Sequence, residues 1–382
     1  MNRPKKICFV TGTRADYGIQ SRLMQRLAQT PGVDLQIIAT NMHLSDDYGH
    51  TIDEIVADGL TVNYQVKMNL RDTSPRGTLH ALAECQAGMA DAIEALRPDM
   101  MVVLGDRYEM LAAATAALIY RIPLAHLYGG ETTEGAYDDA IRHAITQMAS
   151  LHFTSTGQYR DRIIAMGKPA DTVYHVGALG VDNITATPLL SLNELEESIG
   201  AKLGEGFILA TYHPATMAGG NEKADTEAML RALTPLLAER RVLFTLPNSD
   251  TGSSAVAKAI KDWAEEHNDR VVAVASLGRV RYFSALSHCA AVVGNSSSAL
   301  IEAPSFAKPT LDIGPRQKGR AAGPTVAHCD ISTEAIADGL ATVLSPDFIP
   351  AAIATGIPLN PYAKPDTLDT IIQHIIDFSN RL

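Results

Sequence analysis

The sequence contains no apolar run of the roughly 18 residues that a membrane-spanning helix needs. The longest candidate, residues 112–120, has the pattern of a buried helix. At the N-terminus, MNRPKK leads directly into a strand-like ICFV, without the apolar segment and small-residue cleavage site of a secretory signal peptide. We therefore expect a cytoplasmic protein without a membrane span.

Cysteine and positive charge are both scarce. The four cysteines lie far apart and form no CxxC pair, so their spacing predicts reduced thiols and not a metal site. Lys and Arg number 32 against 43 Asp and Glu, which gives a formal net charge of −11. Such an acidic chain is a poor candidate for binding nucleic acid or an anionic membrane, although it can still bind an anion locally.

Two common nucleotide-binding motifs are missing, GxGxxG and GxxxxGK followed by Ser or Thr, which removes the main support for a NAD-binding or P-loop protein. Internal repeats, low-complexity tracts and coiled-coil heptads are missing too. The composition, 46% hydrophobic and 20% charged residues, is that of a folded globular protein. At about 150 residues per domain, 382 residues predict two to three domains.

Short apolar runs alternate with longer helical patterns along the whole chain, which predicts parallel α/β sheets. We expect strands at 7–11, 35–40, 61–66, 100–104, 124–127 and 152–155, and again at 207–212, 242–246, 271–274, 291–293 and 310–313. We expect helices at 17–29, 76–96, 107–120, 138–149, 222–239, 253–266, 280–287, 298–306 and 366–378. Two such series predict two doubly wound domains, 1–180 and 181–365, with a boundary near residues 177–192.

Ligands of open α/β sheets bind beyond the carboxyl ends of the strands, so the residues that follow each strand are candidates for the site. The first strand is followed by TGTRADYG. Its amides and helix dipole could hold an anion, and Arg14 could pair with a phosphate. The alternative is a tight turn in which Asp16 caps the helix.

An acidic residue, Asp106, follows the apolar strand at 100–104 after a single glycine. An acid at the end of a buried strand is costly unless it is paired or lies in an open site. The position therefore favours a functional carboxylate, and the alternative is an N-cap for the next helix.

A second acidic group follows the strand at 124–127, in the segment GGETTEGAYDD. Closely placed carboxylates raise one another's pKa and can divide the acid and base roles of a reaction. Asp138 and Arg142 are four residues apart, as are Asp139 and His143, so each pair shares one helical face. Solvated surface ion pairs are the alternative interpretation.

Polar residues also follow the strands of the second half. His213 ends one strand, and a histidine is well suited to proton transfer near neutral pH. Asn248 follows the next strand, and the run GNSSS opens a helix whose hydroxyls and amides suit a phosphate. Glu302, one turn after Ser298, could bind a ribose diol; a serine N-cap with a structural glutamate is the alternative. The loop 316–320 concentrates positive charge that could offset a diphosphate.

The segments TGTRADYG, GDRYE, GGETTEGAYDDAIRHAIT, TYHP, PNSD and GNSSSALIEAPSFAKP occur in this order. Together they resemble the UDP-N-acetylglucosamine 2-epimerase family, in its hydrolysing, sialic-acid-pathway branch. The resemblance runs from about residue 5 to about residue 320, and the order and spacing of the segments make it specific.

The resemblance implies a GT-B-like architecture of two Rossmann-like, doubly wound α/β domains facing across a cleft, with the C-terminal helix, within 366–382, returning to the first domain. That return would supply the docking surface that its apolar face needs. The first domain would carry the sugar and the catalytic acids, and the second would bind UDP. The hydrolysing branch releases UDP and N-acetylmannosamine, or a related deoxy sugar. Its proposed route is anti elimination of UDP to a glycal followed by addition of water, and no metal or redox cofactor is needed. The resemblance also suggests a homodimer or homotetramer.

The resemblance assigns roles to individual residues. Arg14 matches a diphosphate-contacting arginine, Asp106 a catalytic aspartate, Asp138 the acid that opens a DD-x-x-R segment, and His213 a histidine near the leaving group. Tyr282 matches an aromatic ring near uracil. The phosphate and ribose positions match Ser296, Ser297, Ser298 and Glu302, and we expect Arg142 and Asn248 to contact the substrate as well.

One departure affects these assignments. Many non-hydrolysing relatives carry a catalytic glutamate two residues after a histidine, and here Tyr128 stands two residues after His126. We expect Glu131 to take the carboxylate role, with Glu134 as the alternative. A sub-branch acting on the 2,4-diacetamido-2,4,6-trideoxy sugar of legionaminic acid synthesis looks similar, so the sugar stays open. A GT-B glycosyltransferase would explain the serine-rich helix start but not the acidic residues. A third hypothesis is a protein that binds a nucleotide sugar without catalysing a reaction.

Overall fold

The computed structural model describes residues 3–134, 136–215 and 221–382. The chain divides into two compact units. Unit 1 contains the chain up to Glu131, Asp138–Asn183 and Lys364–Leu382, and unit 2 contains Thr132–Tyr137 and Ile184–Ala363. The main division falls inside helix α7 (Leu179–Ala186), three residues after the expected one. The assignment of Thr132–Tyr137 to unit 2 was not expected from the sequence.

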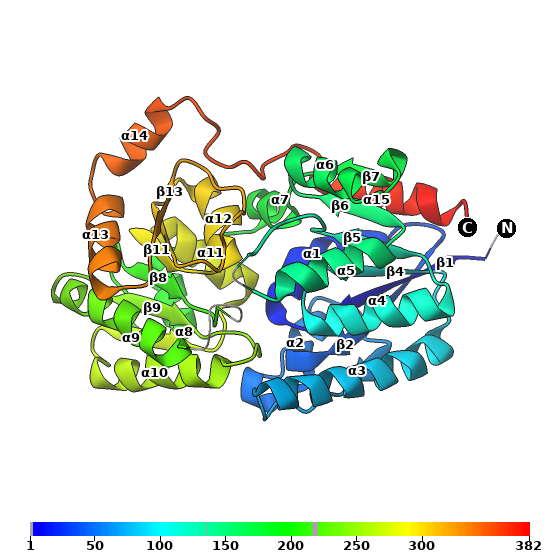
Figure 1. Ribbon diagram of the computed structural model, residues 1–382, viewed down its shortest axis with the longest axis horizontal. Coiled ribbons are helices and arrows are strands. Elements are labelled where there is room, and N and C mark those ends of the chain that lie inside the picture. The colour runs from blue at the N-terminus through cyan, green and yellow to red at the C-terminus, as the bar shows by residue number, and fades with distance from the viewer. Residues whose placement is uncertain (1–2, 135, 216–220) are drawn as a thin grey trace. The chain divides into compact units, whose positions relative to one another are not determined.

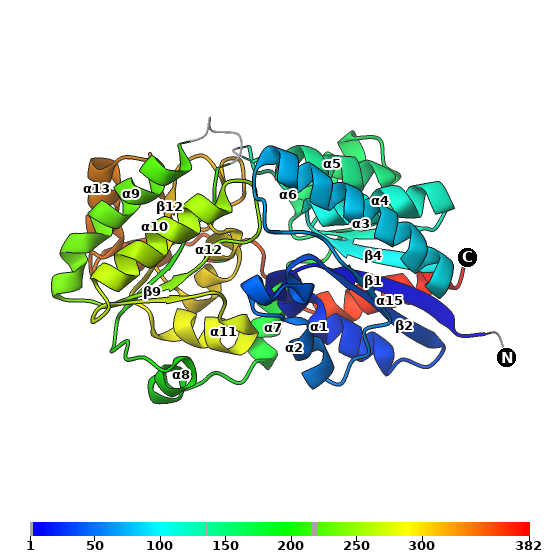
Figure 2. The same ribbon diagram turned by 90° about the horizontal axis from the view of Figure 1, so that it is seen from below.

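Unit 1 is built on a seven-stranded parallel sheet of order β3-β2-β1-β4-β5-β6-β7. Figure 2 shows helices α3, α4 and α5 on one face of this sheet and α1 and α15 on the other. The strands are β1 (Lys5–Thr11), β2 (Val33–Thr40), β3 (Tyr64–Val66), β4 (Met100–Leu104), β5 (Leu124–Leu127), β6 (Leu151–Thr154) and β7 (Val173–His175). The helices are α1 (Arg14–Ala28), α2 (Ile52–Ala57), α3 (Pro75–Leu96), α4 (Tyr108–Tyr120), α5 (Asp138–Met148), α6 (Gly157–Ala165), α7 and α15 (Thr367–Ser379).

Unit 2 is built on a six-stranded parallel sheet of order β10-β9-β8-β11-β12-β13, of which β8, β9, β11 and β13 are labelled in Figure 1. The strands are β8 (Ile208–Thr211), β9 (Val242–Thr245), β10 (Val271–Val274), β11 (Ala291–Gly294), β12 (Thr310–Ile313) and β13 (Val326–Cys329). The helices are α8 (Leu192–Ile199), α9 (Glu222–Leu233), α10 (Ser253–Glu266), α11 (Gly278–His288), α12 (Ser297–Ile301), α13 (Thr333–Val343) and α14 (Phe348–Ala354). Both units are therefore doubly wound, Rossmann-like α/β folds, as the sequence predicts.

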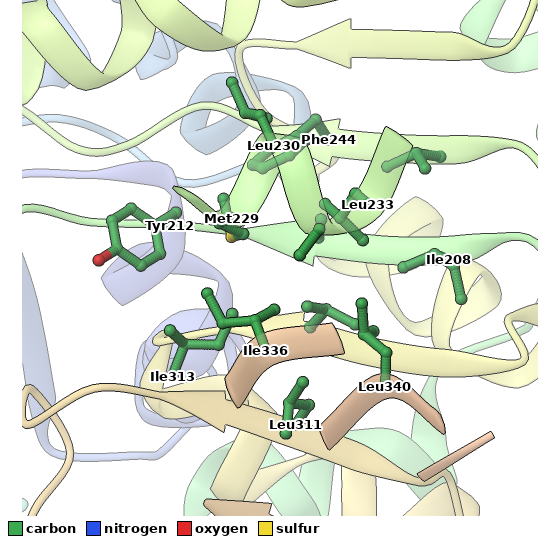
Figure 3. Packing of buried hydrophobic residues seen from close by; sticks show 14 of the residues in the cluster. Ile208, Tyr212, Met229, Leu230, Leu233, Phe244, Leu311, Ile313, Ile336 and Leu340 are labelled. Carbon is green, nitrogen blue, oxygen red and sulfur yellow. The ribbon is translucent and has the colours of Figure 1, made fainter. Parts of the chain in front are cut away.

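The cores follow from the alternation of apolar strands and amphipathic helices. Strand β4, with the sequence MMVVL, is buried at every position, because a central parallel strand is covered on both faces. In unit 2, residues of α9 and α13 pack against one face of the sheet, and Figure 3 shows Leu233 and Ile336 on these helices facing the strands. The second face of that sheet packs against residues of α8, α11 and α12.

Two predicted helices end earlier than expected. The helix expected at 222–239 stops as α9 and continues as a 3-10 turn, Thr234–Ala238, and the one expected at 298–306 stops as α12 before the turn Ala303–Phe306. Both turns have proline at their start, and proline lacks the N–H that an α-helix requires.

Helix α15 belongs to unit 1 and packs beside α1 (Figure 2). The Thr367 hydroxyl donates to the Val176 carbonyl at 2.6 Å, and the His374 ring stacks on Tyr174 with 3.6 Å between centroids. The apolar residues Leu368, Ile371, Ile372 and Ile375 are buried in this interface with the rest of unit 1. The amphipathic pattern of this helix thus has its docking surface.

All four cysteines are free thiols, and three of them are buried. Among the described residues, no three His, Cys, Asp or Glu side chains gather closely enough to hold a metal ion. No single helix in the same part of the chain is long and apolar enough to cross a membrane; the bent pair α13 and α14 passes that test only when both helices are counted together.

Candidate active site

Asp106, which follows β4, is paired with the buried guanidinium of Arg142 on α5. One Arg142 nitrogen, Nη2, donates to Asp106 Oδ2, and the other, Nη1, donates to the Glu131 carbonyl at 3.0 Å. Arg142 is only 1% exposed, whereas the Asp106 side chain keeps 23% of its surface open. The ion pair offsets the desolvation cost of an acid at the end of a buried strand, and part of the carboxylate stays exposed.

Glu131 is brought to the same edge of the sheet by a tightly held Gly129-Gly130 turn. Its side chain is 1% exposed, and the Ser155 hydroxyl donates to Oε1 at 2.5 Å. Arg162 donates to the Gly130 carbonyl at 2.5 Å. Gly130 has φ +77°, and a Cβ there would lie 2.6 Å from the Tyr159 carbonyl oxygen, so only glycine fits the turn.

The two aspartates that open α5 have different surroundings. Asp138 is buried at the start of the helix. Asp139 Oδ2 lies 3.5 Å from His143 Nε2, the pair expected from their spacing, and its Oδ1 accepts from Arg142 at 3.4 Å. Arg142 therefore has protein carboxylates as partners, where we expected it to contact substrate. It is buried among Asp106, Asp139 and the Glu131 carbonyl.

Glu134 lies in a different environment from Glu131. It belongs to unit 2, its side chain is 52% exposed, and its Oε2 lies 3.5 Å from Lys318 Nζ. Its backbone N–H donates to the Lys318 carbonyl at 3.3 Å. Of the two glutamates that the sequence left open, Glu131 is the one whose backbone carbonyl shares Arg142 with Asp106.

Tyr128, at the position where relatives carry a glutamate, has a structural contact. It adopts φ +65°, and its hydroxyl accepts from the Gly180 N–H at 3.0 Å, in the first turn of α7. Since Tyr128 is also buried, this contact ties the loop after β5 to α7.

His126, on β5, was not expected from the sequence to lie beside the turn that carries Asp106. Burial lowers its pKa to about 4, so the ring is neutral. Its Nε2 lies 2.7 Å from the Gly105 carbonyl and its Nδ1 3.1 Å from the Thr146 hydroxyl. The neutral ring thus donates to the carbonyl just before Asp106 and fixes that turn. A polar residue inside an otherwise apolar strand was the available signal.

The TGTR turn after β1 is not open to an anion through its amides. The Asp16 carboxylate accepts from the backbone N–H groups of Gly12, Thr13 and Tyr17 at 2.9, 2.7 and 2.9 Å. Thr13 is the N-cap and Asp16 the third helical residue of a capping box. The helix start is therefore filled by the chain's own carboxylate. Arg14 pairs with Glu54 at 2.7 Å and keeps 18% of its side chain exposed.

In unit 2, His213 follows β8 and is buried. Its backbone is held by Asn295, which follows β11: the His213 N–H donates to Asn295 Oδ1 at 2.7 Å, and Asn295 Nδ2 donates to the His213 carbonyl at 2.8 Å. Asn295 was not singled out from the sequence, where it stands as one polar residue before a serine run. It joins the ends of two neighbouring strands.

The serine run and Glu302 lie at α12 as expected. Ser296, Ser297 and Ser298 are half-buried, and Glu302 is buried one turn later. The Tyr282 hydroxyl, on α11, is hydrogen-bonded to Ser298 Oγ, and burial raises the pKa of that phenol. Tyr282 is thus fixed beside the hydroxyls, in a position set by α11.

Two further expected contributors lie at the same edge of unit 2. Asn248 follows β9 and is half-buried. In the basic loop, Arg316 donates to the Asn295 carbonyl at 3.1 Å and Gln317 donates to it at 2.7 Å. Part of the positive charge of this loop is therefore placed against the turn that opens α12.

Comparisons with known proteins point to one family. The family model described as UDP-N-acetylglucosamine 2-epimerase matches residues 25–376. The chain is 35% identical over 374 residues to the Escherichia coli protein named polysialic acid biosynthesis protein P7, a match that covers 98% of this chain and 94% of that one. It is 34% identical over 316 residues to the Campylobacter jejuni protein named GDP/UDP-N,N'-diacetylbacillosamine 2-epimerase (hydrolyzing), covering 83% and 82% of the two chains.

The fold is similar to solved structures of the same kind. The Neisseria meningitidis UDP-GlcNAc 2-epimerase, solved with UDP-GlcNAc bound, has a TM-score of 0.78 at 18% identity, covering 97% of this chain and 100% of that one. At this identity the likeness establishes a GT-B-like fold of two parallel sheets with interleaved helices. On the family model and the sequence relatives together, the chain belongs to the UDP-N-acetylglucosamine 2-epimerase family.

Proposed function

We propose that this protein is a hydrolysing UDP-N-acetylglucosamine 2-epimerase that releases UDP and N-acetylmannosamine for sialic-acid-type sugar synthesis. The observation that carries the proposal is that one buried arginine, Arg142, holds both the Asp106 carboxylate and the backbone carbonyl of Glu131, while the Glu131 carboxylate accepts from Ser155. Two carboxyl groups held at the end of one sheet suit a reaction that removes a proton and later returns one.

The reaction is balanced as an elimination followed by a hydration. A base takes the proton from carbon 2, the electron pair forms a carbon 1–carbon 2 double bond, and the carbon 1–oxygen bond breaks as UDP leaves with its electrons. Water then adds to the glycal, its hydroxyl to carbon 1 and a proton to carbon 2 on the opposite face. We assign proton transfer to Asp106, Glu131 and Asp138, with Arg142 orienting the Asp106 carboxylate and Ser155 orienting that of Glu131.

Unit 2 has the groups that suit the nucleotide. Serine hydroxyls at 296–298 can donate to phosphate oxygens, and the buried carboxylate of Glu302 can accept from a ribose diol. We assign uracil to the vicinity of Tyr282 and polar contacts to Asn248. His213 is assigned to the leaving diphosphate, with Arg14 of unit 1 as a cationic contact, since charge develops there as the bond breaks.

The sugar has one rival. The Campylobacter jejuni relative, and a Legionella pneumophila protein 33% identical over 341 residues, are both named for hydrolysing N,N'-diacetylbacillosamine nucleotides. UDP-2,4-diacetamido-2,4,6-trideoxyglucose is therefore the second candidate substrate. It differs from UDP-N-acetylglucosamine at carbons 4 and 6, away from the carbon that reacts.

The deciding experiment incubates the protein with each UDP-sugar in heavy water and follows the products by NMR. The proposal expects UDP, a free 2-epimerised amino sugar and deuterium at carbon 2. Faster turnover of the diacetamido compound would assign the second substrate. Product without deuterium at carbon 2, or transfer of the sugar to an acceptor with its configuration at carbon 2 kept, would refute the elimination.

Matched variants separate the assigned roles. Glu131→Gln and Asp106→Asn should lower turnover by about 100-fold or more while UDP still binds, because each removes a proton-transfer group. Glu134→Gln is the control for Glu131→Gln and should keep normal turnover, since Glu134 is exposed and pairs with Lys318. Glu302→Ala should instead weaken UDP binding, measured by calorimetry. Equal losses of turnover in both glutamate variants would contradict the assignment of Glu131.

A further inference from the structure

Asn295 is bonded through every polar group it has. Besides the two side-chain bonds to the His213 backbone, its own N–H donates to the Thr211 carbonyl at 3.1 Å. Its carbonyl accepts from both Arg316 and Gln317. With 1% of its surface exposed, Asn295 is fixed between the end of β8, the start of α12 and the basic loop.

The backbone around His213 needs such a partner. Residue 214 is proline, which has no N–H to donate and keeps the residue before it out of the helical region. Strand β8 ends at Thr211, so the two polar groups of His213 lie beyond its ladder. The Asn295 side chain supplies one acceptor and one donor in their place, like one rung of a sheet.

The geometry leaves little freedom between the two strand ends. Gly294 has φ +136°, and a Cβ there would lie 1.8 Å from the Thr211 carbonyl oxygen. The β11 backbone therefore lies directly against that of β8, and the side chain of Asn295 starts from a fixed point. A shift of Asn295 would move the His213 backbone with it.

We propose that Asn295 is a positioning residue that holds His213 for the reaction and couples its place to the serine turn that opens α12. The proposal rests on the role assigned to His213 under the proposed function. Because Asn295 precedes Ser296 and hydrogen-bonds to the backbone of His213, the position of the histidine is linked to that of the phosphate-binding hydroxyls.

The kinetic test combines Asn295→Asp with His213→Ala in the full-length chain, with whichever UDP-sugar the wild type turns over. Aspartate keeps the shape of asparagine and the oxygen that accepts from the His213 N–H, but it places an acceptor against the His213 carbonyl. We expect Asn295→Asp to lower kcat by about 10- to 100-fold while KM stays within about threefold. The double variant should be no slower than His213→Ala alone, because Asn295 acts through His213. Effects that multiply in the double variant, or an unchanged kcat in Asn295→Asp, would overturn the proposal.

A matched control removes another buried asparagine. Asn183 is also 1% exposed, and its Nδ2 donates to the carbonyls of Gly18 and Ile19 at 3.2 and 2.8 Å. Asn183→Ala should lower the melting temperature without the selective loss of kcat. An equal loss of kcat in this control would show that destabilisation alone explains the effect, and the positioning role would be wrong.

A second measurement does not depend on turnover. The imidazole NMR signals of His213, assigned by their loss in His213→Ala, should shift in Asn295→Asp and stay unchanged in Asn183→Ala, with and without UDP. Unshifted signals in Asn295→Asp would contradict the proposal directly. Absence of turnover in the wild type, with shifted signals in Asn295→Asp, would refute the proposed function and leave the positioning of His213 supported.

Discussion

The two units have the same strand order around their first strand but different chemistry where that order reverses. In unit 1 the reversal lies between β1 and β4, and in unit 2 between β8 and β11. Gly105-Asp106 follows β4, and Gly294 ends β11 directly before Asn295, so a glycine and then a polar residue occupy equivalent places. Asp106 faces a buried guanidinium, whereas Asn295 faces the backbone of a histidine. The same fold thus places a carboxylate in unit 1 and, in unit 2, an asparagine that hydrogen-bonds to the backbone of a histidine.

The largest effect should come from changing the two glycines. Gly294→Ala would place a Cβ 1.8 Å from the Thr211 carbonyl oxygen, while at Gly105, with φ +78°, no atom lies within 4 Å of a built Cβ. We expect Gly294→Ala to cost more than about 4 kcal/mol and Gly105→Ala about 1 kcal/mol, the cost of the backbone conformation alone. Urea unfolding measures both. Similar losses in the two variants would show that the strand ends are not packed differently.

The next largest effect is expected from removing the arginines that contact Asp106 in unit 1 and Asn295 in unit 2. Arg142→Met would leave the carboxylates of Asp106 and Asp139 without their buried cation, and we expect a loss of about 3–5 kcal/mol in the free energy of unfolding. Arg316→Met removes one of two donors to the Asn295 carbonyl, so about 1 kcal/mol is expected. Adding Asp106→Asn to Arg142→Met should recover part of the loss. No recovery would contradict the pairing in unit 1.

Equivalent pairs of neighbouring strands in the two units carry histidines whose pKa values are shifted in opposite directions. In unit 1, His126 and His152 face each other on β5 and β6, and burial lowers their pKa values to about 4 and about 3. In unit 2, Asp312 and His328 face each other on β12 and β13, and the carboxylate raises the pKa of His328, while burial raises that of Asp312.

The buried pair predicts acid sensitivity of unit 1. The folded rings stay neutral while the unfolded chain takes up protons near pH 6.5, so the free energy of unfolding falls as the pH drops from about 6.5 toward 4. Both ring nitrogens of His152 are buried without a hydrogen-bond partner among the described residues. His152→Phe should raise stability by about 1–2 kcal/mol at pH 7 and flatten this decline. A decline as steep as in the wild type would contradict the assignment.

The smallest effect is expected in unit 2, where the dependence of stability on pH has the opposite sign. Because Asp312 raises the pKa of His328, the charged pair stabilises the fold below about pH 6.5 and this contribution is lost as the pH rises through the folded pKa. The His328 side chain is 53% exposed, so solvent screening keeps the effect of His328→Gln below about 1 kcal/mol. Urea midpoints at pH 5.5 and 8 should differ from the wild type only at the lower pH. A larger loss at pH 8 would reverse the sign and refute the pairing.

Much of the fold could be predicted, because apolar strands and amphipathic helices leave a local pattern. Strand β4 matches its expected range at both ends, and Asp106 falls where a strand-end acid was expected. Strand β13, with the sequence VAHC, was missed because it is only partly buried and has no apolar run. Helices α6 and α8 were missed because they are short.

The parts of the site that could not be predicted depend on contacts between residues far apart in the chain. The grip of Asn295 on His213 spans 82 positions, and the placement of Thr132–Tyr137 in unit 2 depends on the loop around Lys318. The sequence left two interpretations of the turn after β1, an anion site or a helix cap by Asp16, and only the contacts of Asp16 with the amides of Gly12 and Thr13 show that the cap is present. Sequence spacing shows which groups are available but not which of them are already bonded.

The return of α15 to unit 1 sets an order for the folding of a newly made chain. Unit 2 draws most of its residues from one continuous stretch, Ile184–Ala363, which leaves the ribosome before α15 does. Unit 1, although it is begun first, stays incomplete until that last helix is made. In the meantime, the surface that receives Leu368, Ile371 and Ile375 is exposed to water and to other unfinished chains. Synthesis of unit 1 therefore begins before that of unit 2, but unit 1 is completed after it.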